Sequence, residues 1–309
     1  MLHTVTLSPG FDDYYTVTGL AWGGVGAMEA YRSVPSGKGV SCARAAVALG
    51  VPTVAHVAVG QVGADDYAAR LDGEQIVHRL TVVPGSIRHN LTLVDGTGER
   101  VAAHFMGERL RIDDESSLGR LLDGVLAEVT EGDLVTLNGS LAQGLPDDTW
   151  ARLATACLER GASVIVDAQG AALRACLEVR GVTAFKPNDD EITALPGLAD
   201  LPSDERVSAA LSLFADAGAE IPLVSLGARG VAVLRRGEPT VLTCPVERAV
   251  QSVMAGDTFV AGLAWGLMGG AEGEDAVRHG LAAAAAHVEG LEGEALRSRA
   301  EDLLRAITA

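Results

Sequence analysis

From about residue 115 onward, hydrophobic positions alternate between short apolar runs and stretches with helical spacing. Short apolar runs indicate buried strands, and apolar residues three or four positions apart indicate amphipathic helices. The predicted strands are 134–138, 164–167, 183–185, 222–225, 231–235 and 241–243, and the predicted helices are 118–129, 149–160, 189–195, 205–217, 256–268, 274–287 and 294–307. This alternation predicts a mainly parallel sheet that is covered by helices on both faces.

The first 110 residues follow a less regular pattern. Apolar runs at 2–7 and 54–59 predict strands of the same sheet, and residues 40–49 predict a helix that ends at Gly50. Further strands are predicted at 14–20, 28–34, 90–94 and 100–105, the last two as a hairpin across Asp95-Gly96-Thr97-Gly98. Because these segments break the alternation, we expect a small lid over the site. The chain is expected to form one domain, 1–309, with lid strands within about 12–36 and 88–107.

Composition narrows the choice of partners. Hydrophobic residues make up 48% of the chain and aromatic residues only 4%, so the core must consist mainly of Ala, Val and Leu. The net charge of −17 argues against nucleic acid or an anionic membrane as a partner, because both reward clustered Lys and Arg. An anionic small substrate needs only a few local cations and stays compatible. No apolar run reaches about 18 residues, so no membrane span is predicted.

Two further observations concern the compartment. The first seven residues have the pattern of a strand, without the basic start and cleavage site of a signal peptide. The cysteines lack metal-ligand spacing and are expected to be buried, reduced thiols of a cytoplasmic protein. They are Cys42, Cys157, Cys176 and Cys244.

The segment 251–263 carries the most informative chemistry. A small, flexible Ala255-Gly256 pair precedes Asp257, and an apolar helical pattern follows. Free N–H groups at a helix N-terminus, with the positive end of the helix dipole, form an anion site. A carboxylate there repels phosphate, unless it removes a proton from a hydroxyl that attacks phosphorus. The alternative interpretation is that Asp257 is only a helix N-cap, and the local pattern alone favours it.

Other candidate residues lie at predicted strand ends, each with a structural alternative. Asp12 follows the first strand and could be an ordinary turn residue. Ser36-Gly37-Lys38-Gly39 precedes a helix and supplies a cation and two glycines, but it lacks the phosphate-loop spacing and could be a simple helix entry. Arg88 and Asn90 point to one face of a strand. Arg88 could clamp a phosphate or carboxylate, or could be an exposed strand arginine.

Two more motifs are candidates for a nucleotide site. Asn188 and Glu191, after a strand that ends at Lys186, have capping-box spacing, and they could also hold water around a magnesium–nucleotide complex. The segment Ser225-Leu226-Gly227-Ala228-Arg229-Gly230 joins two strands. Its glycines would let a base or phosphate lie on the backbone, although a plain hairpin loop gives the same pattern.

The order of these motifs resembles that of the ribokinase-like (PfkB) carbohydrate kinases, and the resemblance covers essentially the whole chain. It is strongest for the phosphosugar branch, 1-phosphofructokinase and tagatose-6-phosphate kinase. Thr6-Leu7-Ser8-Pro9-Gly10-Phe11-Asp12 is similar to the Thr-Leu-Asn-Pro-Ala-x-Asp opening of that branch, and Gln251-Ser252-Val253 to its Asn-Ser-Val. The resemblance implies a three-layer α/β sandwich, with a mainly parallel sheet between helices and a small β-sheet lid.

The resemblance also implies an activity and a set of site residues. The activity is ATP-dependent phosphorylation of a sugar phosphate of the fructose-1-phosphate or tagatose-6-phosphate type, with Mg²⁺. Asp257 would be the general base, and the backbone amides of 254–257, including Ala255 and Gly256, the anion hole. Substrate would contact Asp12, Gly37, Lys38, Gly39, Ser41, Arg88 and Asn90, with Lys38 and Arg88 on its phosphate. ATP would contact Lys186, Asn188, Glu191, Ser225, Gly227, Ala228 and Gly230, with Asn188 and Glu191 holding the metal through water.

The sequence departs from the family pattern at two positions that matter. Met254 replaces the first glycine of Gly-Ala-Gly-Asp, and a positive φ there would strain a methionine by roughly 1–2 kcal/mol. Ser41 replaces an asparagine that commonly contacts the sugar. A kinase for an unphosphorylated sugar or nucleoside and a non-catalytic binding protein therefore stay open as alternatives. A lid strand that pairs with a second copy would make a homodimer.

Overall fold

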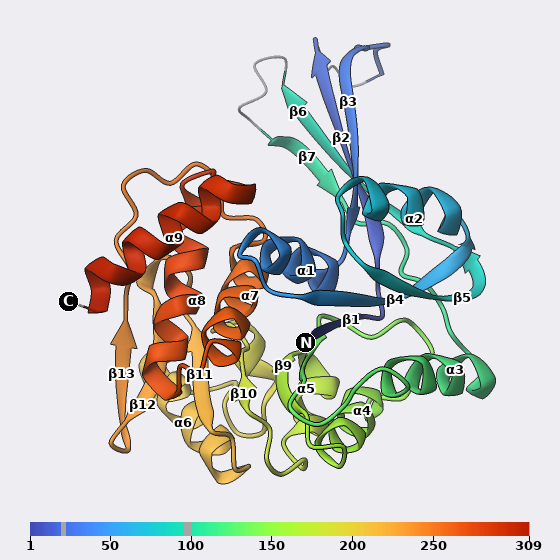
Figure 1. Cartoon of the computed structure of the whole chain (residues 1–309). Coiled ribbons are helices and arrows are strands. Elements are labelled where there is room, and N and C mark those ends of the chain that lie inside the picture. The colour runs from blue at the N-terminus through green and yellow to red at the C-terminus, as the bar shows by residue number, and fades with distance from the viewer. Residues whose placement is uncertain (20–22, 96–100, 309) are drawn as a thin grey trace.

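The computed structural model describes residues 1–19, 23–95 and 101–308, and its largest element is a nine-stranded sheet (Figure 1). The strand order is β13-β12-β11-β10-β9-β8-β1-β4-β5. All neighbours pair in parallel except two pairs at one edge, β11–β12 and β12–β13, which are antiparallel. The bounds are β1 Leu2–Thr6, β4 Thr53–Val62, β5 His78–Ser86, β8 Leu134–Asn138, β9 Ser163–Asp167, β10 Ala184–Phe185, β11 Ile221–Ser225, β12 Val231–Arg235 and β13 Glu238–Leu242.

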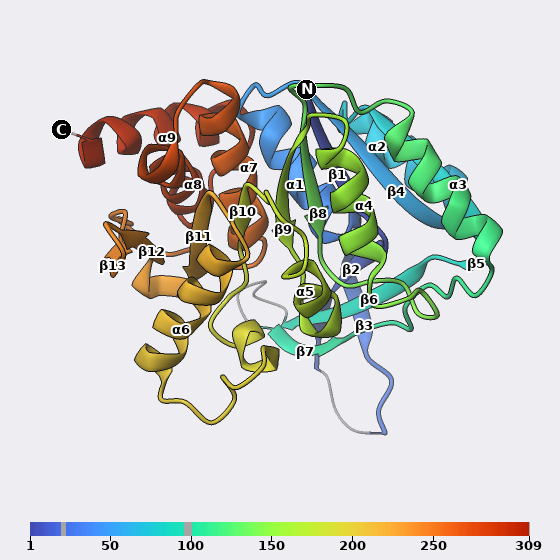
Figure 2. The ribbon, with the colours of Figure 1, turned by 90° about the horizontal axis from the view of Figure 1, so that it is seen from below.

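Helices cover both faces of this sheet. One face carries α1 Lys38–Ala48, α2 Ala64–Gly73, α7 Ala255–Met268, α8 Gly273–Val288 and α9 Gly293–Thr308. The other face carries α3 Glu115–Leu126, α4 Thr149–Leu158, α5 Gly170–Cys176 and α6 Ser203–Asp216. Helices α4 to α6, at the bottom of Figure 1, lie nearest the viewer in Figure 2. The predicted α/β sandwich is therefore confirmed.

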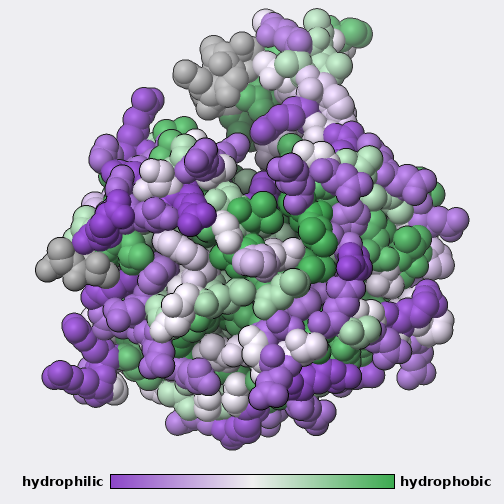
Figure 3. All heavy atoms as spheres, in the orientation of Figure 1, coloured by the Kyte–Doolittle hydropathy of each residue, from purple (hydrophilic) through white to green (hydrophobic). Residues whose placement is uncertain are grey.

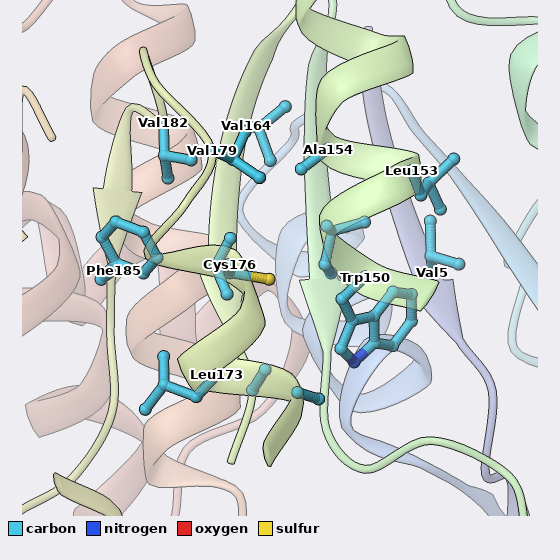
Figure 4. Close-up of a cluster of buried hydrophobic side chains, with 14 of the residues drawn as sticks. Val5, Trp150, Leu153, Ala154, Val164, Leu173, Cys176, Val179, Val182 and Phe185 are labelled. Atoms are coloured by element: carbon cyan, nitrogen blue, oxygen red, sulfur yellow. The ribbon is translucent and has the colours of Figure 1, made fainter. Parts of the chain in front are cut away.

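Alternate residues of the central strands point to opposite faces of the sheet and belong to separate hydrophobic cores. Leu134 packs toward α1 and α7, whereas the next residue, Val135, packs toward α4. Since side chains alternate across a strand, a sheet covered on both faces needs apolar residues at nearly every position. Figure 4 shows the core on the side of the sheet that α4 covers, where Trp150 lies among valines and leucines. The indole N–H of Trp150 also donates to the Gly139 carbonyl (3.0 Å), which fixes the loop after β8.

A second sheet stands apart from the main body, at the top of Figure 1. Its order is β3-β2-β6-β7, with bounds β2 Gly10–Thr18, β3 Ala27–Ser36, β6 Arg88–Asp95 and β7 Val101–Phe105. We call it the small sheet. Strands β6 and β7 pair antiparallel as predicted, and the predicted turn at 96–98 lies outside the described residues. Strands β2 and β6 pair in parallel, which places Asp12 opposite Asn90.

Several local predictions were incomplete or wrong. Helices α2 and α5 and strand β5 were not predicted. Helix α2 buries only Ala64, Tyr67 and Leu71, and β5 is mostly exposed or half-exposed, so their apolar signals are weak. The helix expected at 189–195 is a single 3₁₀ turn, Glu191–Ala194. Asp12 lies inside β2, so its interpretation as a turn residue was wrong.

The strand order fixes where a ligand can bind. From β1 the chain proceeds to β4 on one side, and β8 later pairs on the other side of β1. Such a switch point leaves a crevice at the carboxyl ends of the strands, where ligands bind in open α/β sheets. Three of these ends, in β1, β8 and β9, are Thr6, Asn138 and Asp167.

The cysteines were expected to be buried thiols, and this holds for three of the four. All four cysteines are free; Cys42, Cys157 and Cys176 are buried, and Cys244 is partly buried. No helix in the described ranges is long and apolar enough to cross a membrane.

The α7–α8 contact provides a test of the packing. A Cβ on Gly262 of α7 would lie 2.6 Å from both Ala283 Cβ and the His279 carbonyl oxygen of α8. We predict that Gly262→Ala lowers the free energy of unfolding in urea by about 1–3 kcal/mol. Gly119→Ala in α3, where an added Cβ meets no atom within 4 Å, is the control. It should raise that free energy by about 0.5–1 kcal/mol, and equal effects of the two changes would contradict this packing.

Candidate active site

Asp257 is the third residue of α7, and its side chain is buried. It makes no capping hydrogen bond; the residue at the cap position is Met254. The interpretation of Asp257 as an N-cap was therefore wrong. Among the hydrogen bonds of the described residues, the amide of Ala255 reaches Ser252 O and that of Thr258 reaches Met254 O, but the amides of Gly256 and Asp257 have no backbone acceptor. These two open N–H groups can hold an anion at the helix N-terminus.

The backbone enters α7 in a strained conformation. Met254 has φ 64° and ψ 3°, in the left-handed region that favours glycine. The condition under which methionine is strained at this position is therefore met. Two contacts with the C-terminal end of α8 hold the loop that precedes α7. The ring of the buried His287 hydrogen bonds the Val253 carbonyl (2.7 Å), and the Val250 amide donates to Val288 O (2.8 Å). These anchors fix the two open amides.

A second buried carboxylate, Asp167, lies at the end of β9 and is fully inaccessible. Its Oδ1 atom is 3.2 Å from Lys38 Nζ and 3.3 Å from Lys186 Nζ. The chain contains only these two lysines, and both meet at this oxygen. The Oδ2 atom is buried without a hydrogen-bond partner in the described residues. Asp167 is not among the residues predicted from the sequence, although its position directly after the apolar run Val164-Ile165-Val166 is a signal that points to it.

The lysines connect Asp167 to its surroundings. Lys38 Nζ also lies 3.3 Å from Glu191 Oε1, so this ammonium joins two carboxylates. Burial lowers the pKa of Lys38, but the neighbouring carboxylates outweigh burial and raise it overall. A Cβ built on Gly256 would lie 3.5 Å from Lys186 Nζ, so the second ammonium borders the open amides of α7. An anion there would meet a cation and a helix N-terminus together.

These surroundings set the ionisation of Asp257. Burial raises its pKa, and repulsion by Asp167 adds to the increase. Attraction by Lys38 and Lys186 and a hydrogen bond from the Ser41 hydroxyl act in the opposite direction, and the pKa is about 7. A carboxylate with such a pKa can accept a proton near neutral pH. Ser41, expected at the sugar, thus faces Asp257.

The small sheet contributes a chain of contacts that starts at Asp12. Asn90 Nδ2 donates to Asp12 Oδ1 (2.7 Å), and Asn90 Oδ1 accepts the Gly107 amide (3.1 Å). Arg88 is half-buried, and its guanidinium donates to the carbonyls of Ser8 (3.0 Å) and Pro9 (3.2 Å). Burial lowers the pKa of Arg88. Asp12, Arg88 and Asn90 therefore come together where the small sheet joins the body.

A cavity of about 500 Å³ opens at this junction. Its lining comes from the ends of β1 and β8, from the loops after β8 and β9, from Lys38 and Arg88, and from the segment after β7. The lining residues are Thr6, Ser8, Lys38, Arg88, Met106, Gly107, Glu108, Arg109, Asn138, Gly139, Ser140, Gln143 and Gln169. Of the predicted substrate residues, only Lys38 and Arg88 line it.

Gly37 and Gly39 do not line this cavity, and their surroundings explain why glycine is required. A Cβ on Gly39 would lie 2.4 Å from Thr6 Oγ1, and one on Gly37 would lie 2.7 Å from Thr6 Cγ2. Gly37 also has φ 134°. Both glycines let α1 approach β1 closely, and this approach brings Lys38 to Asp167.

The predicted nucleotide residues follow β10 and β11. Asn188 and Glu191 form the expected capping box: Asn188 Oδ1 accepts the Glu191 amide (2.7 Å), and Glu191 Oε2 accepts the Asn188 amide (2.9 Å). Ser225 Oγ donates to Pro187 O (3.2 Å), which joins the two motifs. Gly227 begins the 3₁₀ turn that contains Ala228, Gly230 directly follows this turn, and both glycines have positive φ. No group of three or more His, Cys, Asp or Glu side chains in the described residues could hold a metal ion.

The strain at Met254 can be measured. We predict that Met254→Gly raises the free energy of unfolding by up to about 1 kcal/mol, because glycine adopts positive φ without the penalty while its flexible unfolded chain offsets part of the gain. Arg236, on the β12–β13 turn with φ 54°, supplies a matched control, because Arg236→Gly should give a similar gain far from α7. A loss of stability in Met254→Gly alone would contradict the strain.

The raised pKa of Asp257 predicts a pH-dependent stability. Because the folded-state value of about 7 lies above the unfolded value of 3.8, ionisation of Asp257 removes stability as pH rises through this window. Asp257→Asn cannot ionise. Its Tm advantage over the parent protein should therefore grow between pH 5 and about 7 and level off above about 8. A constant Tm difference across this range would show that Asp257 titrates normally.

Comparisons with known proteins show the family of the chain. The family described as "pfkB family carbohydrate kinase" matches residues 14–295. A 1-phosphofructokinase of Bacillus subtilis is 29% identical over 93% of this chain and 92% of its own length, and one of Xanthomonas campestris is 30% identical over 86% and 83%.

Solved structures share the overall fold. Escherichia coli phosphofructokinase-2, in a complex with substrates and products, superposes with a TM-score of 0.86 at 25% identity and covers 100% of this chain and 99% of its own. Ribokinase from Thermotoga maritima, with a TM-score of 0.73 at 21% identity over 99% of both chains, shares the fold. The chain therefore belongs to the pfkB family of carbohydrate kinases and has their ribokinase-like fold.

Proposed function

We propose that the chain transfers the γ-phosphoryl group of ATP to a hydroxyl of a sugar phosphate, of the kind used by 1-phosphofructokinases. The observation that carries this proposal is a buried carboxylate, Asp257, beside two open amides and the Lys186 ammonium. This combination suits a reaction in which a proton is accepted and phosphoryl charge is stabilised at the same place. Membership of a carbohydrate kinase family supports it.

In the proposed reaction, Asp257 accepts the proton of the attacking sugar hydroxyl. The hydroxyl oxygen bonds to the γ-phosphorus, the bond from phosphorus to the bridging oxygen breaks, and ADP leaves. The amides of Gly256 and Asp257, with Lys186, stabilise the charge on the transferring group. Lys186, Asn188, Glu191, Ser225, Gly227, Ala228 and Gly230 are proposed to border ATP.

Mg²⁺ is proposed to accompany ATP and would neutralise charge on its phosphates. The residues fit this role, because oxygen ligands are what Mg²⁺ prefers and Asp167 Oδ2 is buried without a hydrogen-bond partner in the described residues. The Asn188 and Glu191 side chains, already engaged in the capping box, are proposed to act through water.

A phosphorylated sugar is favoured over an unphosphorylated sugar or nucleoside by the cavity at the junction. Arg88 projects into it from the start of β6 and can bind a phosphate with the N–H groups that its two carbonyl contacts leave over. Asp12, Asn90, Ser41 and the α1 entry at Gly37, Lys38 and Gly39 are proposed to surround the sugar. In a chain of net charge −17, such local cations are needed to bind two anions together.

We further propose that the chain is one domain whose small sheet acts as a lid that excludes water during transfer. Val25, which lies between β2 and β3, and Met28 at the start of β3 are exposed. Figure 3 shows hydrophobic and hydrophilic residues side by side at this end of the small sheet. Tyr31, Val101 and Phe105 are exposed along its edge strands. This surface supports pairing of the small sheet with a second copy, and an inhibited form of Escherichia coli phosphofructokinase-2 is described as tetrameric. A cytoplasmic location also stays a prediction.

A substrate panel tests the proposed reaction. With Mg-ATP, we predict turnover of fructose 1-phosphate or tagatose 6-phosphate and much weaker turnover of the same sugars without phosphate. Arg88→Ala should raise KM for the phosphosugar by about tenfold to a hundredfold, because it removes a charge-assisted contact. An unphosphorylated sugar as the best substrate, or an unchanged KM, would favour the alternative kinases.

The pH dependence of turnover tests the role of Asp257. Protonated Asp257 cannot accept a proton, so kcat/KM should fall as pH drops below about 7. Ser41→Ala removes a hydrogen bond that lowers this pKa, so it should move the decline to higher pH. A profile that is flat between pH 6 and 8 and identical in Ser41→Ala would contradict this role.

A further inference from the structure

We propose that Arg109 is a second phosphate-binding residue, and that with Arg88 it makes the enzyme selective for phosphorylated sugars. This inference rests on the proposed function and adds a residue that the family motifs do not include. Arg109 follows β7, lines the cavity at the junction and has no hydrogen-bond or ion-pair partner in the part of the chain that the structure describes. The cavity thus holds a guanidinium whose donors are available to a ligand.

The segment that carries Arg109 is fixed on both sides. On one side, the Gly107 amide donates to Asn90 of the small sheet, and a Cβ on Gly107 would lie 2.4 Å from the His89 carbonyl oxygen. On the other side, the carbonyl of the buried Leu110 accepts the Gln143 amide (2.8 Å) of the main body. The backbone on either side of Arg109 is therefore held between the small sheet and the body, and its exposed side chain extends from this anchored segment.

Among the cationic side chains that line the cavity, Arg88 and Arg109 are the two that make no ion pair in the described structure. Lys38 also lines the cavity, but its ammonium is already shared by Asp167 and Glu191. Arg88 uses two contacts to backbone carbonyls, which hold it in place, and it makes no ion pair in the described part of the chain. Two guanidinium groups on one cavity can bind a dianionic phosphate in forked geometry.

The position of the cavity explains selectivity. A phosphate held by Arg88 and Arg109 would touch both the small sheet and the loop after β8, where Gly139 and Ser140 line the same space. Phosphate binding would then join the lid to the body, whereas a sugar without phosphate would lack this link. The substrate phosphate thus contributes to closure as well as to affinity.

The test compares two arginines that are two residues apart. Arg109→Ala should raise KM and the calorimetric Kd for fructose 1-phosphate or tagatose 6-phosphate by about tenfold to a hundredfold, and change KM for the unphosphorylated sugar little. Arg109→Lys should recover part of this loss. Arg111→Ala removes the same charge from a side chain that pairs with Asp113 and Gln143 and does not line the cavity, so it should resemble the parent protein.

A second variant should change KM for the phosphosugar in the opposite direction. Glu108 carries the one carboxylate among the lining residues of the described structure, and Glu108→Gln should lower KM for the phosphosugar. Equal effects of Arg109→Ala and Arg111→Ala would overturn the inference. Absence of turnover with every sugar phosphate in the parent protein would instead contradict the proposed function. The calorimetric comparison would still decide the role of Arg109.

Discussion

Two buried carboxylates at the same edge of the sheet, Asp167 and Asp257, impose the constraint on which the site depends. Ionised carboxylates that are taken out of water repel each other and are destabilising unless cations compensate them. The chain compensates them with its only two lysines, which meet at Asp167 Oδ1. The compensation is incomplete at Asp257, whose pKa stays near 7. Burial beside a second carboxylate destabilises the fold, and the same burial gives Asp257 the raised pKa that a proton acceptor requires.

Much of the local architecture serves to hold this charge cluster. Gly37 and Gly39 bring α1 against β1 so that Lys38 reaches Asp167, and the 3₁₀ turn at Glu191 supplies its second partner. Met254 enters α7 with a strained backbone, and His287 fixes the preceding loop, so two amides stay open beside Lys186. One strained residue and two open amides thus lie together where phosphoryl charge is proposed to develop, and such features are common at functional sites.

The sequence predicted the sandwich and the order of its motifs because a sheet covered on both faces needs continuous apolar strands. It also identified the capping box, which depends on residues three apart. It did not predict α2 or β5, whose burial is sparse. It placed Arg88 and Lys38 at the site but missed Asp167 and Arg109. Asp167 acts through its contacts with Lys38 and Lys186, and Arg109 is proposed to act through its place on the cavity lining. Both arrangements join segments far apart in the chain, which no local pattern contains.

The same limit applies to individual conformations. The substitution at Met254 was visible in the sequence, but only the backbone shows that this position has positive φ. Likewise, the sequence does not show that Ser41 lies beside Asp257 and lowers the pKa of this carboxyl group. Both residues therefore influence the carboxylate itself, one through the backbone that precedes it and the other through its protonation.

The most direct test of this account compares the parent protein with Asp257→Asn in phosphoryl transfer from Mg-ATP to the sugar phosphate. We predict that kcat falls by about 10²- to 10⁴-fold, because the amide cannot accept the proton. The dissociation constants of ATP and of the sugar phosphate should stay close to those of the parent protein. A variant that retains kcat within a few-fold of the parent protein would contradict the assignment of Asp257 as the base.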